Sequence, residues 1–215
     1  MIVLVGGEKG GSGKSCLAQN LAVYFRRNYQ GEVLLVDCDP QRTTSDWIQE
    51  RKDNTDLPSI NCVQLYGNIR EDLLSLKSRY DFVVVDCGGQ DNRALRSSMS
   101  VASHALIPLR PKRRDLKTLP HMEDIITTCK MVNPSLSAAV VMTQCPSLPN
   151  QARRILEAKE VCSSFCVQVL DSIIYSRNVY DDSEERGLSV MEIEPDGKAA
   201  EEIRAIAKEF LQVGV

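Results

Sequence analysis

The chain has 215 residues, of which 43% are hydrophobic and 26% are charged, and its net charge at pH 7 is −3. This length suits one well-filled core and is short for two, so we expect a single P-loop-type domain over residues 1–215. The composition is typical of a soluble, globular protein and excludes a membrane-spanning helix, which needs about eighteen consecutive apolar residues. The first apolar run is too short for a secretory signal, so we expect a cytoplasmic location.

Apolar runs recur along the whole chain and predict strands. They are rich in valine, isoleucine and leucine and mostly do not alternate with polar residues, which is typical of strands buried on both faces of a parallel sheet. The runs are residues 2–6, 33–37, 61–65, 82–86, 105–109, 138–142 and 169–175.

Amphipathic stretches between these runs predict helices over residues 14–28, 115–132, 150–165 and 198–212. In the first stretch, one helical face carries Leu17, Leu21, Tyr24 and Phe25. The repeated strand–helix units predict an α/β fold, namely a single doubly wound, mostly parallel β-sheet flanked by helices. No linker, internal repeat or low-complexity segment interrupts this pattern.

Residues 7–15 read G-E-K-G-G-S-G-K-S and fit the phosphate-binding pattern G-x-x-x-x-G-K-S/T between a predicted strand and a predicted helix. Glycines let backbone amides turn toward an anion, and the helix N-terminus adds partial positive charge. We expect Lys14 to reach the β- and γ-phosphates and Ser15 to ligate Mg²⁺. The alternative is a glycine-rich turn with a surface lysine. The nucleotide-binding residues expected in this loop are Gly10, Gly11, Ser12, Gly13, Lys14, Ser15 and Cys16.

Aspartates stand at the ends of two predicted strands, at the edge where open α/β sheets bind ligands. Asp86 ends the run 82–86, and we expect it to contact Mg²⁺ directly or through water. Asp39 lies two residues beyond Asp37, and we expect it to position metal-bound water or the attacking water. The alternative is that these aspartates cap helices or turns. For Asp37, structural support is at least as good an interpretation as chemistry.

Other reactive side chains do not form a competing centre. His104 and His121 have no partner nearby in the sequence, and His104 precedes a strand, where we expect it to cap or to pack. None of the eight cysteines forms a C-x-x-C motif, so reduced and mostly buried thiols are expected. Phosphoryl transfer to water can proceed by positioning and charge neutralisation without a strong base, which suggests slow turnover.

Charged residues are unevenly distributed. Residues 110–117 contain five basic residues and one acid, whereas residues 181–202 contain nine acids and two basic residues. The basic run could bind the phosphates of a nucleic acid, or it could be a solvated loop beside the nucleotide. There is no helix-turn-helix signature and only 5% of the residues are aromatic, so base-specific readout is not expected. The basic side chains of the run are Arg110, Lys112, Arg113, Arg114 and Lys117.

Three segments together resemble the ParA/MinD family of deviant Walker A ATPases. They are K-G-G-S-G-K-S at 9–15, D-C-D-P-Q at 37–41 and V-V-V-D-C-G-G at 83–89. The chain looks most like the small ParA-like plasmid and chromosome partition ATPases that lack an N-terminal DNA-binding domain. The similarity extends to residues 105–111 and 176–195 and covers essentially the whole chain. It implies a P-loop NTPase fold of the deviant Walker A type.

The resemblance also implies roles for single residues. Lys9 matches the family's signature lysine, which crosses a dimer interface, contacts the phosphates of the partner's ATP, and would act with Lys14 and Asp39 in catalysis. A charge placed there makes dimerisation depend on the bound nucleotide and stabilises the transition state. From spacing alone, Lys9 could be a solvated loop lysine. The positions implied for Mg²⁺ are Ser15, Asp39 and Asp86, and those implied for adenine are Thr143 and Gln144.

The function implied by the resemblance is a cycle driven by ATP and Mg²⁺. Such proteins form a homodimer in the ATP state, and the dimer binds double-stranded DNA non-specifically and associates with the nucleoid. A ParB-like protein or another centromere or cargo adaptor stimulates hydrolysis, which releases the dimer and moves DNA or another cargo. Arg177 matches the arginine of the family's I-P-R-N segment, implicated in DNA binding, and related proteins place DNA-contacting residues near Arg153 and Arg154. The DNA-binding residues expected are Arg110, Lys112, Arg113, Arg114, Arg153, Arg154 and Arg177.

The sequence departs from the family pattern at the nucleotide site. Ser15-Cys16 replaces the common Thr-Thr and keeps the hydroxyl for Mg²⁺. Ser176 replaces a proline that packs near the base in such proteins.

The main alternative is a MinD-like, ATP-dependent positioning protein that acts on a membrane or on a protein complex. A membrane partner is not expected, because the polar side of residues 198–212 mixes acidic and basic residues and does not attract an anionic bilayer. Lys9 argues against a small-molecule kinase, which does not need this residue. The intact set of Lys14, Asp39 and Asp86 argues against a scaffold that does not hydrolyse ATP.

Overall fold

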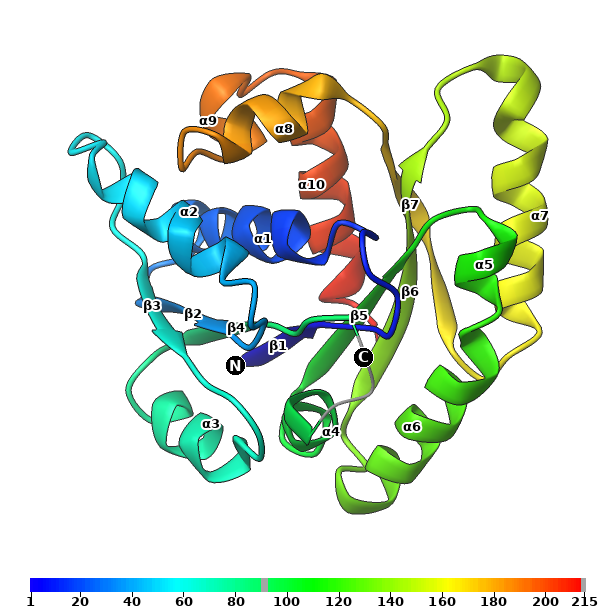
Figure 1. Cartoon of the computed structure of the whole chain (residues 1–215), viewed down its shortest axis with the longest axis horizontal. Coiled ribbons are helices and arrows are strands. Elements are labelled where there is room, and N and C mark those ends of the chain that lie inside the picture. Colours follow the sequence, from blue (N-terminus) through cyan, green and yellow to red (C-terminus); the bar gives the residue numbers. More distant parts are fainter. Residues whose placement is uncertain (90–92, 214–215) are drawn as a thin grey trace.

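The computed structural model describes residues 1–89 and 93–213, and its centre is one parallel β-sheet (Figure 1). The strand order is β3-β2-β4-β1-β5-β6-β7, and every pair of neighbouring strands is parallel. All seven predicted strands are confirmed, and the sheet is entirely rather than mostly parallel. The strands are β1 (Ile2–Val5), β2 (Val33–Asp37), β3 (Asn61–Gln64), β4 (Phe82–Asp86), β5 (His104–Leu109), β6 (Ser137–Cys145) and β7 (Gln168–Tyr175).

Helices cover both faces of the sheet (Figure 1). One face carries α1 (Lys14–Asn28), α2 (Thr43–Lys52), α8 (Asn178–Glu184), α9 (Val190–Ile193) and α10 (Lys198–Phe210). The other carries α3 (Arg70–Lys77), α4 (Arg93–Met99), α5 (Arg113–Leu116), α6 (Leu119–Val132), the 3₁₀ turn η1 (Pro149–Gln151) and α7 (Ala152–Ser163).

The predicted helices are confirmed with changes at their ends. The helix over 14–28 matches α1, whereas the stretch 115–132 divides into α5 and α6. The stretch 150–165 corresponds to η1 and α7, and α10 ends at Phe210. The sequence pattern does not predict α2, α3, α4, α8 or α9. These helices are short, at four to ten residues each, so they show little amphipathic periodicity.

The core has two layers, one on each face of the sheet. Alternate residues of β1 enter opposite layers, since Val3 and Val5 pack with α1 and α10 while Ile2 and Leu4 pack with α4 and α6. Burial on both faces explains why the strands read as continuous apolar runs. Within residues 1–89 and 93–213, no helix is long and apolar enough to cross a bilayer.

Strand β1 lies between β4 and β5, with β2, β3 and β4 on one side of it and β5, β6 and β7 on the other. The strand order therefore switches direction at β1. Crevices at such switch points, beyond the carboxyl ends of the strands, are where open α/β sheets bind ligands. The register places Asp86 beside both Val5 and Asp37. The phosphate-loop sequence and the two aspartate-bearing strand ends therefore meet at one edge.

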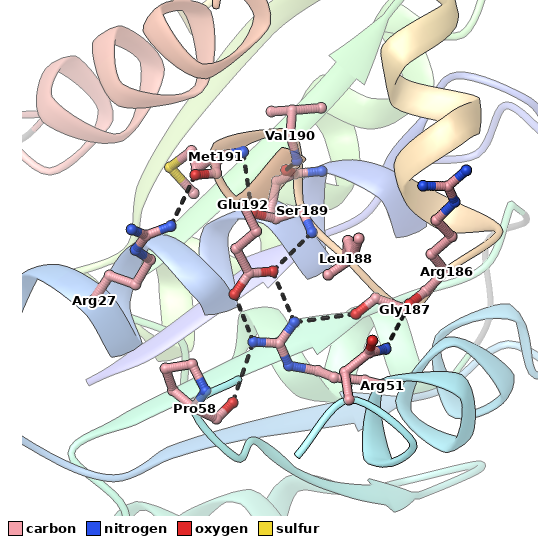
Figure 2. A network of polar contacts seen from close by, with 12 residues as sticks. Arg27, Arg51, Pro58, Arg186, Gly187, Leu188, Ser189, Val190, Met191 and Glu192 are labelled. Atoms are coloured by element: carbon pink, nitrogen blue, oxygen red, sulfur yellow. Dashed lines mark hydrogen bonds and ion pairs between the residues drawn. The ribbon is translucent and has the colours of Figure 1, made fainter. Parts of the chain in front are cut away.

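The end of α2 is fixed to α9 by a buried ion pair (Figure 2). The guanidinium of Arg51 donates to both carboxylate oxygens of Glu192, at 2.7 and 2.8 Å, and both side chains are 4% exposed. Arg51 also donates to the carbonyl oxygens of Gly187 and Pro58. Glu192 accepts from the backbone amide of Ser189 in a capping box that begins α9. These contacts hold α2 and the α8–α9 connection as one unit.

Candidate functional site

The phosphate-loop segment leaves β1 and turns directly into α1. Gly11 and Gly13 adopt φ angles of 69° and 81°, in the left-handed region that side chains other than glycine rarely adopt. Gly13 is the N-cap of α1, and its carbonyl oxygen accepts from the amide of Leu17. The loop therefore lies at a helix N-terminus, where backbone amides and the helix dipole favour an anion.

Lys14 is buried beneath this loop. Its Nζ donates to the carbonyl oxygen of Lys9 at 2.8 Å, so the ammonium group lies across the turn. Burial is the main cause that lowers the pKa of Lys14, and the nearby carboxylates of Asp86 and Asp39 oppose this shift. A lysine held in this way presents its charge to an anion in the loop.

Two residues at the end of β6 support the loop from the side. The hydroxyl of Thr143 donates to the carbonyl oxygen of Ser12 at 2.8 Å, and the amide of Gln144 donates to that of Gly11 at 3.0 Å. Thr143 is only 1% exposed, whereas Gln144 is exposed and lines the cleft. We predicted contacts to adenine for both residues. Both line the cleft, and in this structure the Thr143 hydroxyl also supports the loop.

Asp86 ends β4 and is completely buried. Its Oδ2 accepts from the hydroxyl of Thr44 at 2.7 Å. Its Oδ1 is buried and has no partner within the described chain. Burial raises the pKa of Asp86 to about 6, although the side chains of Thr44 and Ser15 oppose this shift.

The unpaired Oδ1 makes this position fit a magnesium ion. Burying a carboxylate oxygen without a hydrogen bond costs folding free energy. A hard cation such as Mg²⁺ binds oxygen ligands of this kind. No group of three or more histidine, cysteine or acidic side chains that could hold a metal occurs in residues 1–89 and 93–213. Magnesium needs few protein ligands beside phosphates, and the oxygen-bearing side chains available for it here are those of Asp86, Ser15 and Asp39.

Asp37 has the structural role that we considered as an alternative. Its Oδ2 accepts from both the amide and the hydroxyl of Ser45, at 2.8 and 2.6 Å, in the first turn of α2. Its Oδ1 accepts from the amide of Asp39 at 3.0 Å. All three contacts are local, so Asp37 fixes the start of α2 and the turn that carries Asp39.

Asp39 lies at the open side of the cleft, and its Oδ1 accepts from the amide of Gln41 at 2.9 Å. A Cβ atom on Gly88 would lie 2.8 Å from Asp39 Oδ2, and one on Gly89 would lie 2.8 Å from the amide nitrogen of Gly10. The two glycines after Cys87 therefore allow the three loops to pack against one another.

A cleft of about 510 Å³ joins these elements, which is large enough for a small organic ligand. It runs from the phosphate loop to the start of α8. Its lining residues are Gly10, Gly11, Gly13, Lys14, Ser15, Cys16, Asp39, Gln41, Thr43, Gly89, Thr143, Gln144, Ile174, Tyr175, Ser176, Arg177, Tyr180, Asp181 and Glu184. The structure thus brings together most of the predicted nucleotide and metal residues.

Lys9 lies outside the cleft lining, in a turn that also exposes Gly10 and Gly11. Its neighbour Glu8 contacts the ring of His121, which lies in the first turn of α6. This contact could not be predicted from the sequence, because it joins residues that are 113 positions apart. His104 packs edge-on against Phe210, which confirms a packing role for that histidine.

Two of the arginines predicted to bind DNA are held within the protein. Arg110 donates to both carboxylate oxygens of buried Asp115, at 2.8 and 3.0 Å, and it also contacts the carbonyl oxygen of Gly10. Arg177 forms an ion pair with Glu202 at 2.6 Å and lies over the ring of Tyr175. Arg177 lines the cleft and Arg110 contacts its rim at Gly10, and the sequence motifs do not indicate these roles.

The other basic residues are exposed, and we call them together the α5/α7 patch: Lys112, Arg113, Arg114, Lys117, Arg153 and Arg154. Lys112, Arg113 and Arg154 line a groove of about 490 Å³ between α5 and α7. Arg153 is 88% exposed and pairs with Glu157. The two basic segments, distant in sequence, therefore lie side by side (Figure 1).

Acidic residues lie together in a groove between α2 and α8. Asp46 and Glu50 of α2 share a groove of about 450 Å³ with Asp181, Glu184 and Glu185 of α8 and its C-terminus. Burial raises the pKa of Glu184, and the charges of Asp181 and Glu50 raise it further. Because α2 was not predicted, the sequence showed only the α8 half of this surface.

The cysteines are mostly buried, as predicted. Five are buried, Cys16 and Cys62 are half-buried, and Cys166 is exposed. Burial is the main cause that raises the pKa of Cys16 to about 12, so this thiol stays protonated beside the phosphate loop.

Comparison with known proteins gives a consistent family. Residues 3–190 match the family described as CobQ/CobB/MinD/ParA nucleotide binding domain. Maintenance of carboxysome distribution protein A of Halothiobacillus neapolitanus is 29% identical over 208 residues, covering 94% of this chain and 93% of that protein. Chromosome partitioning protein ParA of Myxococcus xanthus is 25% identical over an alignment of 252 residues, covering 98% of this chain and 88% of that protein.

A solved structure shows the same fold. The complex of a Cyanothece McdA variant with ATP has a TM-score of 0.72 and 17% sequence identity, and the match covers 99% of this chain and 96% of that chain.

Proposed function

This chain belongs to the CobQ/CobB/MinD/ParA nucleotide-binding family, and we propose that it is a ParA-type ATPase that partitions DNA or positions another cargo. The observation that carries the proposal is Asp86 Oδ1, a buried carboxylate oxygen without a protein partner in the described chain. It lies where Ser15, Lys14 and the left-handed glycines of the loop meet. That combination suits Mg²⁺ and the phosphates of ATP.

The residues of the cleft have distinct parts in the proposed hydrolysis. Backbone amides of residues 10–15 cradle the phosphates, and Lys14 neutralises charge on them. Ser15 and Asp86 would hold Mg²⁺, which would supply positive charge to neutralise the charge that develops on the phosphates. Asp39, at the open side of the cleft, orients the attacking water. No side chain of the set is a strong base, so turnover is expected to be slow.

Lys9 is the residue that would link hydrolysis to assembly. It stands outside the cleft of its own chain, on a turn whose neighbours Gly10 and Gly11 are exposed. We infer that it reaches the phosphates bound by a second copy, as in the family that the sequence resembles. ATP then favours the homodimer, and hydrolysis releases it.

The α5/α7 patch is the surface that we propose for non-specific DNA. Its basic residues come from two neighbouring helices and lie on exposed positions. Phosphate contacts of this kind carry no sequence information and weaken steeply with salt. Arg110 and Arg177 are left out of this surface because Asp115 and Glu202 engage their guanidinium groups.

The names of the relatives indicate the kind of cargo and not a particular cargo. Their names refer to carboxysome distribution and to chromosome partitioning. We propose that this protein acts in the cytoplasm, associates with the nucleoid in its ATP state, and is reset by a ParB-like or other adaptor that stimulates hydrolysis. A membrane role is disfavoured because Ile203, Ile206 and Phe210 of α10 are buried against the sheet.

The test is binding to non-specific duplex DNA with ATP, with ADP and without nucleotide, at low and physiological salt. Binding that requires ATP and weakens steeply with salt supports the proposal. If ATP drives dimerisation but no nucleotide state binds DNA, the DNA part is wrong, and the dimer surface must serve a protein or a membrane.

A further inference from the structure

The hydroxyl of Thr44 makes a short, buried contact with the Asp86 carboxylate, and neither the sequence motifs nor the family comparison assigns it a role. The distance from Thr44 Oγ1 to Asp86 Oδ2 is 2.7 Å, and both residues are 0% exposed. The contact joins α2 to the end of β4, 42 residues apart. Because it engages Oδ2 alone, it leaves Oδ1 as the carboxylate oxygen without a protein partner in the described chain.

The hydroxyl is itself held from behind. Gln19 of α1 is 2% exposed, and its Nε2 donates to Thr44 Oγ1 at 3.4 Å. A hydroxyl has one donor hydrogen, and accepting from Gln19 directs that hydrogen toward the carboxylate. Gln19 lies four residues after Ser15 on α1, so one helix carries both the magnesium hydroxyl and the support for Thr44.

The helix that carries Thr44 is anchored at both ends. At its start, Ser45 is bound by Asp37 through both its amide and its hydroxyl. At its end, Arg51 is bound by Glu192, Gly187 and Pro58 (Figure 2). On a helix fixed in this way, complete burial and the contacts to Gln19 and Asp86 hold the Thr44 side chain in place. The position of the Thr44 hydroxyl is therefore set by the fold before any ligand arrives.

We propose that Thr44 is a positioning residue for the metal: its hydroxyl fixes the rotation of the Asp86 carboxylate so that Oδ1 is presented to Mg²⁺. This inference rests on the proposed function, since it deepens the role of the same site. Partners that orient a metal-binding carboxylate are commonly worth about 10-fold to 100-fold in metal affinity. Thr44 acts through Asp86 and does not itself touch the nucleotide or the metal.

The experiment measures Mn²⁺ binding to the ADP complex of the full chain by electron paramagnetic resonance, with nucleotide affinity in EDTA measured in parallel. Thr44→Val keeps the shape and removes the hydroxyl, and Thr44→Ser keeps the hydroxyl. We expect Thr44→Val to bind Mn²⁺ about 10-fold or more weakly, with ADP affinity in EDTA unchanged. Thr44→Ser should remain within about threefold of the wild type, since it retains the donor.

Thr128→Val is the matched control, because the Thr128 hydroxyl donates to the carbonyl oxygen of Asp124 on the exposed side of α6. If Thr44→Val does not fold by circular dichroism, Thr44→Ala replaces it, since it also lacks the hydroxyl. Wild-type Mn²⁺ affinity in either folded variant overturns the inference, as does a Thr44→Ser that is as weak as Thr44→Val. A wild-type protein whose ADP complex binds no Mn²⁺ overturns the proposed function as well.

Discussion

Arg51 and Glu192 are 141 positions apart in the chain, and their side chains meet in a two-pronged ion pair that is almost fully buried. The guanidinium lies over the ring of Trp47 at 5.2 Å, which closes the pair from water on one side. The pair fixes the end of α2, whose first turn carries the contacts to Asp37 and Asp86. Stability and the geometry of the site are thus coupled through one short helix.

The coupling predicts a large effect of breaking the pair. Arg51→Met leaves the Glu192 charge buried without its partner, and Glu192→Leu does the same to Arg51. Removing one partner of a buried ion pair costs about 3–5 kcal/mol. We expect each single variant to lose about 3 kcal/mol of unfolding free energy in urea titrations, and the double variant to lose less than the sum. Additive losses would show that the two charges are not energetically coupled.

The two lysines of the phosphate loop are expected to fail in different ways. Lys14→Ala removes the buried ammonium group that faces the cleft, so ATP binding itself should be lost. Lys9→Ala leaves the cleft lining intact and should bind a fluorescent ATP analogue within about threefold of the wild type, because ATP contacts within the chain remain. Dimerisation with ATP, measured by light scattering, should be abolished in both.

The control for the loop lysines is Lys117→Ala, an exposed lysine just after α5. It should bind ATP and dimerise as the wild type does. If Lys9→Ala still forms a dimer with ATP, the proposal that this lysine acts on a second copy is wrong.

The raised pKa of Asp86 predicts that the free energy of unfolding of the metal-free protein depends on pH. Folding raises its pKa from 3.8 to about 6, so the native state binds more protons than the unfolded state between these values. Its contribution to stability is therefore present at low pH and is lost as the pH rises through about 6. Asp86→Asn keeps an acceptor for Thr44 and removes the charge.

We therefore expect Asp86→Asn to be more stable than the wild type at pH 7.5 by roughly 1–3 kcal/mol, with a smaller difference at pH 4.5. Urea unfolding in EDTA at the two pH values measures this. A difference that does not shrink at the acidic pH contradicts the assignment. Metal binding should show the opposite trend, since Mg²⁺ requires the ionised carboxylate and its affinity should rise through about pH 6.

The sequence was sufficient for much of the fold because burial on both faces of a parallel sheet leaves a strong signal. All seven strands were predicted, and so were the loop residues and Asp86, whose positions follow from strand ends. Helix α2 was not predicted, since its ten residues carry a weak apolar pattern and its N-cap, Arg42, has a left-handed φ of 61°. The role of Thr44 was missed with it.

Long-range partners explain the other differences. Arg177 matched a DNA-binding position by resemblance, yet its charge is engaged by Glu202, which lies on α10. Thr143, predicted to contact the base, lines the cleft and also supports the loop at Ser12, a contact that the motif did not indicate. A local motif identifies which residue type is present, but the choice of partner is made by elements that meet only in the folded chain.

If the α5/α7 patch binds DNA, removing its charges should weaken DNA binding without destabilising the fold. Arg113→Ala combined with Arg154→Ala removes two exposed charges from one groove without touching the core. If each contacts a phosphate, the slope of log affinity against log salt should fall by about 2. Binding of the ATP state to duplex DNA at physiological salt should weaken about 10-fold or more.

The matched control removes two exposed charges elsewhere, with Arg70→Ala and Lys77→Ala on α3, which lies away from α5 and α7 (Figure 1). Both double variants lower the net charge equally, so a difference between them reports position rather than total charge. Fluorescence anisotropy over a range of salt concentrations provides both the affinity and the slope. Equal losses in the two double variants would mean that DNA responds to the overall field and that the α5/α7 patch is not its binding surface.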